Sequence, residues 1–126
     1  MKRGYWVVSY RSISDESAVK AYGALAAPAL ESFGARLSTS STSQVHPHEA
    51  GLQLRSVLVE FDSYDIALAA YESEAYQSAL QALGSGAERD FRIVEARDHI
   101  SINQWDGFNV FGISTAAAGP PLKNRQ

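Results

Sequence analysis

Two charged side chains interrupt segments that otherwise read as buried strands. Glu60 lies one residue before the end of "LRSVLVEF" (54–61), and Arg92 lies within "DFRIVEA" (90–96). A buried charge without a partner is costly, so each must pair, reach a wet cavity or touch a ligand. Glu60 is therefore a candidate proton carrier, and Arg92 is a candidate contact for the polar group of a ligand.

The first strand-like segment, "GYWVVSY" (4–10), supplies aromatic side chains that would lie beside these charges. Side chains of a strand alternate between its two faces. Helices are expected to cover the more apolar set, which is Val7, Val57, Val59, Phe61, Phe91 and Ile93. The opposite face would then hold Trp6, Tyr10, Ser56, Glu60, Arg92 and Arg36. This predicts that Trp6 and Tyr10 stack on a small organic ligand. The competing interpretation is a salt-bridged or hydrated seam between two subunits.

The segment "HPHE" offers a second kind of chemistry. His46 and His48 lie at i and i+2, on one side of an extended segment, and Glu49 is adjacent. Metal sites use such pairs. Histidines beside a loop proline are more often solvated, and the third histidine, His99, lies far along the chain. No metal site is predicted, and His46 and His48 are kept as candidates for proton transfer.

Two tyrosines and one arginine complete the candidate ligand contacts. Tyr22 and Tyr71 lie on helix-like segments facing the predicted sheet, where they are either core residues or ligand contacts. Arg36 follows the first of these segments and either holds an anion or caps and pairs at the surface. The segment "GSG" (84–86) lacks the lysine and the context of a phosphate-binding loop, so no cofactor is predicted.

The elements that must position these residues begin with the strand at 4–10. Apolar residues then recur at steps of three and four up to Phe33, which predicts a helix with Ser14 as its N-cap and Gly34 after its end. Pro28 inside that helix predicts a kink or a division into two helical pieces. The polar segment 35–46 is consistent with either an edge strand or a loop.

The second half of the domain also contains a strand followed by a helical region and a further strand. The strand at 54–61 is followed by a helix that Asp62 or Ser63 can cap, and Ser73 with Glu74 looks like a second helix start. The interruption at "ESE" therefore predicts a bend between two helical pieces. The strand at 90–96 completes a β-α-β-β-α-β order, which is the ferredoxin-like arrangement of an antiparallel sheet with helices on one face.

Four segments together resemble one bacterial family. "GYWVV", "SFGARL", "RSVLVEFDSYDIALAAYESEAYQSAL" and "RDFRIVEA" are similar, in order and spacing, to the domain of unknown function DUF1330, over about residues 3 to 96. The resemblance implies a dimeric α+β barrel, in which two ferredoxin-like sheets pack face to face, and it implies no chemistry. The chain departs from the family pattern at "LSTSSTSQ" and in its 30 residues after position 96.

Composition sets the outer limits. The 126 residues suffice for one domain, and we assign 1–96 to it and 97–126 to an extension with a β-hairpin at 99–113 and a tail at 114–126. The absence of cysteine excludes thiol chemistry and suits the cytoplasm. A net charge of −3 with scattered basic residues argues against nucleic-acid binding, and no apolar run is long enough to span a membrane.

The sequence thus predicts a homodimer with a pocket for a small hydrophobic or aromatic metabolite, and it leaves open whether the protein is an enzyme. The alternative is a cofactor-independent monooxygenase, isomerase or cyclase acting on an aromatic or polyketide-like metabolite, by analogy of fold alone. The enzyme hypothesis requires an enclosed pocket and a carboxyl group with a raised pKa. The binding or assembly hypothesis requires Glu60 to pair with an arginine.

Overall fold

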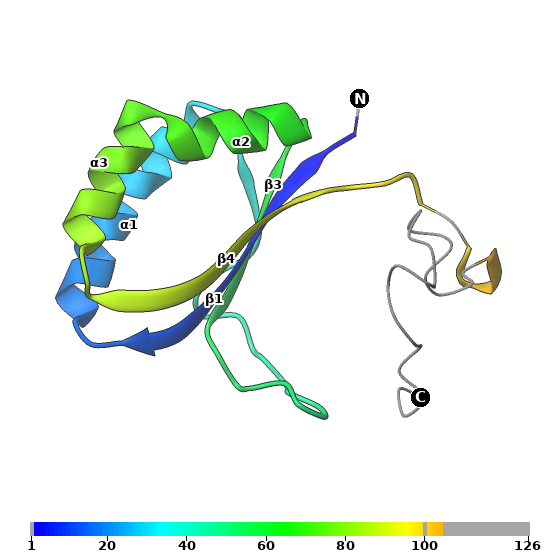
Figure 1. Cartoon of the computed structure of the whole chain (residues 1–126), viewed down its shortest axis with the longest axis horizontal. Helices are drawn as coiled ribbons and strands as arrows, with labels where there is room; N and C mark the ends of the chain where they lie inside the picture. Colours follow the sequence, from blue (N-terminus) through cyan, green and yellow to red (C-terminus); the bar gives the residue numbers. More distant parts are fainter. Residues whose placement is uncertain (1, 100, 105–126) are drawn as a thin grey trace, which may run out of the picture.

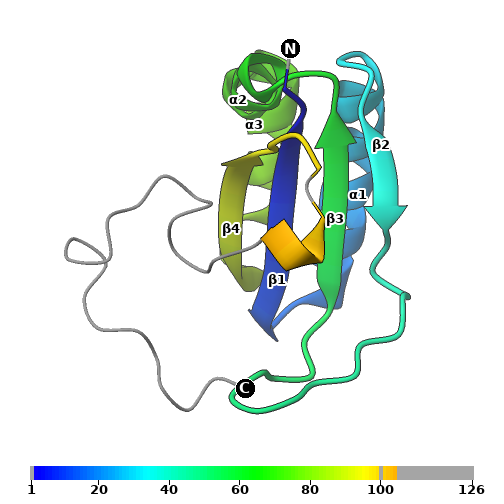
Figure 2. The ribbon, with the colours of Figure 1, turned by 90° about the vertical axis from the view of Figure 1, so that its right-hand side faces the viewer.

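The computed structural model describes residues 2–99 and 101–104. Its elements, in chain order, are β1 (Gly4–Ile13), α1 (Glu16–Glu31), β2 (Arg36–Thr39), β3 (Ser56–Phe61), α2 (Tyr64–Glu72), α3 (Glu74–Leu83), β4 (Ala87–Glu95) and the short 3₁₀ helix η1 (Ile102–Gln104). The strands form one antiparallel sheet in the order β2-β3-β1-β4. Helices α1, α2 and α3 all lie on one face of that sheet (Figure 1). The opposite face, toward the viewer in Figure 2, carries none of these three helices. The ferredoxin-like prediction is confirmed.

The N-cap of helix α1 is Asp15, one residue after the predicted cap Ser14. The Asp15 carboxylate, rather than Ser14, accepts hydrogen bonds from the backbone N–H groups of Ser17 at 3.0 Å and Ala18 at 3.2 Å. Pro28 lies inside a single helix, so the division into two pieces was wrong. The proline falls in the last turn, where it removes one hydrogen bond without ending the helix.

Ser73 produces the bend between α2 and α3, as the "ESE" segment predicted. Its hydroxyl accepts a hydrogen bond from the Tyr76 N–H at 3.2 Å, which caps α3, and donates to the Ala70 carbonyl at 2.8 Å, at the end of α2. Ser63 caps α2 in the same way through the Ile66 N–H. One short polar residue thus ends one helix and starts the next.

The face of β1 that the helices cover is the reverse of the predicted one. Trp6 pairs with Val59 and Ile93, so Trp6 lies on the helix side with Val8 and Tyr10. Its side chain is 1% exposed and its indole Nε1–H donates to the Ala67 carbonyl at 2.9 Å. Val7, predicted to face the helices, is 39% exposed on the other side. The assignments of β3 and β4 were right.

The physical reason lies in the composition of β1. Both faces of "YWVVSY" are apolar, so alternation alone does not choose between them. The face with two large aromatic side chains buries more apolar area, and pairing with the correctly assigned strands selects it.

The polar segment after α1 forms only a four-residue edge strand, β2, and continues as a long loop to β3. Ile102–Gln104 form a 3₁₀ turn, so these three residues are not in a strand of the hairpin predicted at 99–113. The rest of the predicted hairpin to residue 113, and the tail at 114–126, lie outside the described residues. Within the part of the chain that is described, no helix has the length and apolar character to cross a membrane.

Candidate ligand-binding site

A cavity of about 460 Å³ lies between α1 and the helix-covered face of the sheet. Its walls are mainly apolar, and the apolar residues that line it include Trp6, Val8, Ala26, Leu30, Val57 and Val59. Leu37 of β2, with Ser40 and Ser41 of the following loop, line it at the edge of the sheet.

A cluster of Arg89, Tyr22 and Tyr76 forms the polar part of this region. Arg89 is on β4, Tyr22 on α1 and Tyr76 on α3, so three elements must come together to build it. The Arg89 guanidinium donates to the Tyr22 hydroxyl at 3.1 Å and to the Tyr76 hydroxyl at 3.4 Å, and the two hydroxyls are 2.8 Å apart. Arg89 and Tyr22 line the cavity, and Tyr76 supports them from behind, fully buried.

Aromatic rings surround the same guanidinium. Its Cζ lies 4.7 Å from the ring centroid of Tyr22, 5.1 Å from that of Phe91 and 5.5 Å from that of Tyr10. A cation over ring faces is favourable, more so when water is excluded. Burial raises the pKa of the Tyr10 hydroxyl, so it stays protonated in this apolar setting.

Three residues predicted from the sequence as ligand contacts line the cavity together, namely Trp6, Tyr10 and Tyr22. Trp6 and Tyr10 do so from the helix side of the sheet, opposite to the face on which they were expected. Arg36 also borders the cavity, but its guanidinium binds Glu60 at 2.8 Å and Asp62 at 3.0 Å. Arg36 is therefore a surface ion-pair partner, which was the alternative left open.

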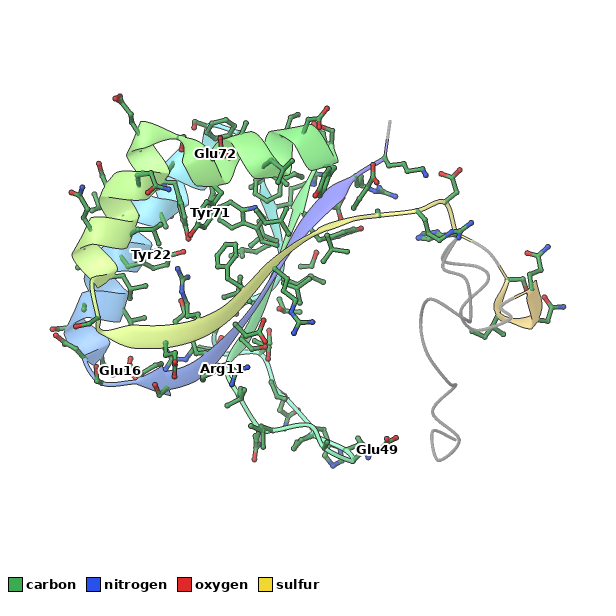
Figure 3. The ribbon with its side chains drawn as sticks, viewed as in Figure 1. Arg11, Glu16, Tyr22, Glu49, Tyr71 and Glu72 are labelled. Atoms are coloured by element: carbon green, nitrogen blue, oxygen red, sulfur yellow. The ribbon has the colours of Figure 1, made fainter. Side chains whose placement is uncertain are left out.

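Tyr71 and Arg92 lie elsewhere. Tyr71 reaches from α2 toward the sheet (Figure 3), where its ring packs against Trp6 and Phe91 at centroid distances of 6.0 and 5.1 Å. It is a core residue outside the cavity lining. Arg92 is on the opposite face of β4, where its Nε donates to Asp90 at 3.0 Å. The sheet separates it from the cavity.

Glu60 is held by arginines on the face away from the helices. Besides the Arg36 contact, its carboxylate lies 3.7 Å from Arg3. The hydrogen bond from Arg36 lowers the pKa of Glu60 below its ordinary value. The proton-transfer hypothesis required a raised pKa, so it finds no support at this residue. The direct pairing is what the binding or assembly hypothesis required.

The two histidine candidates occupy the loop between β2 and β3. Their rings are 4.8 Å apart. Across residues 2–99 and 101–104, no group of three His, Cys, Asp or Glu side chains could hold a metal ion. Figure 3 shows Glu49, the neighbour of His48, at the far end of this loop and away from the helices. The histidines therefore do not join the cavity.

Arg89 is the residue that sequence reasoning missed. The last strand was predicted to begin at residue 90, whereas β4 begins at Ala87, because the charged run "AERD" does not resemble a strand. One signal was present. Arg89 has the same parity as Phe91 and Ile93, which were correctly assigned to the helix-covered face.

Comparison with models of known families identifies the family of this chain. The family model described as "Domain of unknown function (DUF1330)" matches residues 3–97. The chain belongs to this family. A search among curated proteins finds no match for this DUF1330 chain.

Solved structures share the fold of this DUF1330 protein at low identity. RPA0582 of Rhodopseudomonas palustris, a protein of unknown function, is 15% identical with a TM-score of 0.61, over 78% of this chain and 85% of that one. SnoaB of Streptomyces nogalater, a cofactor-independent oxygenase, is 11% identical with a TM-score of 0.52, over 79% of this chain and 98% of that one. At such identities the likeness extends to the fold alone.

Proposed function

We propose that this protein is a cytoplasmic homodimer in which each subunit binds a small, largely hydrophobic molecule in the cavity beneath α1. The cavity itself is the observation that carries the proposal. Its volume of about 460 Å³ falls within the roughly 300–1,000 Å³ of small-molecule sites, which combine apolar walls with a few polar groups. Burial of an apolar molecule against this lining removes apolar surface from water, which is favourable.

A neutral fluorescent probe tests this binding site. N-phenyl-1-naphthylamine is expected to bind with a rise in its fluorescence. Ala26 is 4% exposed and lines the cavity, so Ala26→Leu should fill part of the space and weaken binding by roughly tenfold or more, the cost of a lost apolar contact area. Ala24→Leu is the matched control, because Ala24 is exposed on the same helix and does not line the cavity. Equal binding by both variants would place the probe elsewhere and contradict the proposal.

The homodimer part of the proposal is supported by the face of the sheet that the helices leave uncovered. Val7 and Val94 are 39% and 45% exposed there, and Tyr5 and Leu58 are half-buried beside them. The ion pairs of Glu60 and Asp90 with arginines lie on the same face and provide both signs of charge. A second copy offers the same apolar centre and the same mixture of charges, so the two faces can pair with each other.

The oligomeric state gives a direct test of that pairing. Wild type should have twice the mass of the chain in light scattering, and Val7→Glu should have the mass of one chain, because a charge in the seam would lack a partner. Leu25→Glu is the control, since Leu25 is 46% exposed on α1, on the other side of the molecule. A monomeric wild type, or dissociation of both variants alike, would refute this interface.

A second candidate function is cofactor-independent oxygenation of an aromatic or polyketide-like metabolite. Its support is the fold shared with SnoaB and the aromatic lining of the cavity. The test is oxygen uptake with 1,5-dihydroxynaphthalene, which should exceed the rate without protein and fall in Ala26→Leu. Binding of the naphthylamine probe without any oxygen uptake would favour binding over catalysis.

A further inference from the structure

The guanidinium of Arg89 carries a positive charge that no carboxylate within residues 2–99 and 101–104 neutralises. Among residues 2–99 and 101–104, the ion pairs of the protein are formed by other arginines, namely Arg3, Arg11, Arg36, Arg55 and Arg92. The acceptors of Arg89 are tyrosine hydroxyls. An arginine that loses water normally requires an anion to offset the cost of desolvation.

The tyrosines do not provide that anion. Burial raises the pKa of Tyr76 far above its ordinary value, and the neighbouring Tyr22 adds a smaller effect in the same direction, so the Tyr76 hydroxyl stays protonated. Burial alone would lower the pKa of Arg89, but the contacts with Tyr22 and Tyr76 outweigh it and raise that pKa. The cluster therefore carries a net charge of about +1, since arginine remains protonated under all ordinary conditions.

Hydrogen-bond accounting shows that the cluster has donors to spare. A guanidinium has about five N–H donors, and Arg89 uses one on Tyr22 and one on Tyr76, while its contact with the Tyr10 hydroxyl takes a third. The two hydroxyls share one hydrogen bond of 2.8 Å. Because Tyr76 is fully buried, the arrangement that leaves no buried proton unmatched has Tyr76 donating to Tyr22. The proton of Tyr22 and the remaining N–H groups of Arg89 are then available to the cavity that both residues line.

We infer that Arg89 and Tyr22 bind the carboxylate of the ligand, whose class is therefore a monocarboxylic acid with an apolar, aromatic-sized body. This inference rests on the proposed function and specifies the ligand of the same cavity. A planar guanidinium matches a carboxylate with two parallel hydrogen bonds. The apolar walls contributed by Trp6, Val8 and Val59 receive the rest of the molecule.

The other charged groups of the lining favour a single negative charge. Arg36 is already bound to two carboxylates. Glu31, at the end of α1, adds a negative charge at the cavity edge. A phosphate dianion has two negative charges, of which Arg89 would offset one while Glu31 repels the ligand. A carboxylate has one negative charge, which Arg89 alone offsets.

Calorimetric titration of 2-naphthoate and 2-naphthamide tests the inference, because these molecules have the same ring and nearly the same size but differ in charge. Wild type should bind naphthoate roughly 10- to 100-fold more tightly, the range for hydrogen bonds to a charged group. Arg89→Met should bring the two affinities together. Lys20→Met, which removes an exposed positive charge of α1 that does not line the cavity, should keep the wild-type ratio.

The ratio of the two affinities separates a ligand contact from a purely structural role of Arg89, since a general loosening of the cavity would weaken both compounds alike. If Arg89→Met does not fold, Tyr22→Phe replaces it, and it should lower naphthoate affinity several-fold with naphthamide unchanged. Equal binding of both compounds by wild type overturns the carboxylate inference and leaves the cavity as a binding site. Failure of both compounds also overturns it, and the naphthylamine titration then shows whether the proposed function falls as well.

Discussion

Replacing Trp6 by phenylalanine tests which face of β1 is buried, on which the location of the site depends. Trp6 is 1% exposed and its ring contacts those of Phe61 and Tyr76 at centroid distances of 5.1 and 4.9 Å. Its Nε1–H donates to the Ala67 carbonyl, which ties β1 to α2. Trp6→Phe keeps one aromatic ring and removes both this hydrogen bond and part of the packed volume.

The expected cost has two parts. A net intramolecular hydrogen bond contributes about 0.5–1.5 kcal/mol. Truncating a buried tryptophan to alanine costs about 3–5 kcal/mol, and since phenylalanine keeps most of the apolar side chain, we take about a third of that cost. The free energy of unfolding should therefore fall by about 2–3 kcal/mol, which is a large fraction of the stability of a domain of this size.

The assay is urea unfolding followed by far-ultraviolet circular dichroism at two protein concentrations, with Val7→Ala as the control on the opposite face. The cost of Trp6→Phe should be the same at both concentrations, because Trp6 is already buried within its own chain. Any cost of Val7→Ala should depend on concentration, as expected of a residue in a subunit interface. A larger, concentration-independent loss in Val7→Ala than in Trp6→Phe would refute the assignment of the two faces.

Two further outcomes follow from local geometry. A Cβ at Gly86 would lie 2.7 Å from the Ala18 side chain, so Gly86→Ala should lower the free energy of unfolding by about 1–3 kcal/mol. Gly23 is in a helix and its Cβ would meet nothing within 4 Å, so Gly23→Ala should raise the free energy of unfolding by about 0.5–1 kcal/mol. Thermal unfolding that ranks the two variants the other way would contradict this packing. Because the hydrogen bond from Arg36 lowers the pKa of Glu60, their ion pair stabilises the fold above the ordinary pKa of a glutamate, and this stabilisation is lost as the pH falls through the lowered value. Glu60→Gln should thus be less stable than wild type at neutral pH and approach it in acid, and a gap that stays constant in urea unfolding from about pH 7 to pH 3 would speak against the pair.

The fold was predictable because its signals are local. Each signal depends on neighbours within a few positions. These signals are the capping serines Ser63 and Ser73, the apolar spacing of α1 and the alternation of β3. Cap chemistry and period require no knowledge of distant residues. The order of elements then leaves few ways to build a sheet with helices on one face.

The candidate site was only partly predictable, for reasons visible in single residues. Trp6, Tyr10 and Tyr22 were predicted as ligand contacts and all three line the cavity, but Trp6 and Tyr10 were expected on the opposite face of the sheet. Glu60 and Arg92 were chosen because they are charges in strands, but both find partners on the open face. Arg89 was missed, because it lies in a charged run that gives no sign of burial.

The sequence alone determined the order of the strands and helices, the bend at Ser73 and the membership of the chain in its family, since each depends on residue types at short spacing. Only the tertiary structure decided which side of β1 faces the helices and that Arg89 meets Tyr22 and Tyr76. Those contacts join β4 to α1 and α3, residues 67 and 13 positions apart along the chain. Which face of a strand with two apolar faces is buried depends on the strands that pair with it. That Arg89 has tyrosine hydroxyls as its partners among the described residues becomes apparent only when the groups around it are known.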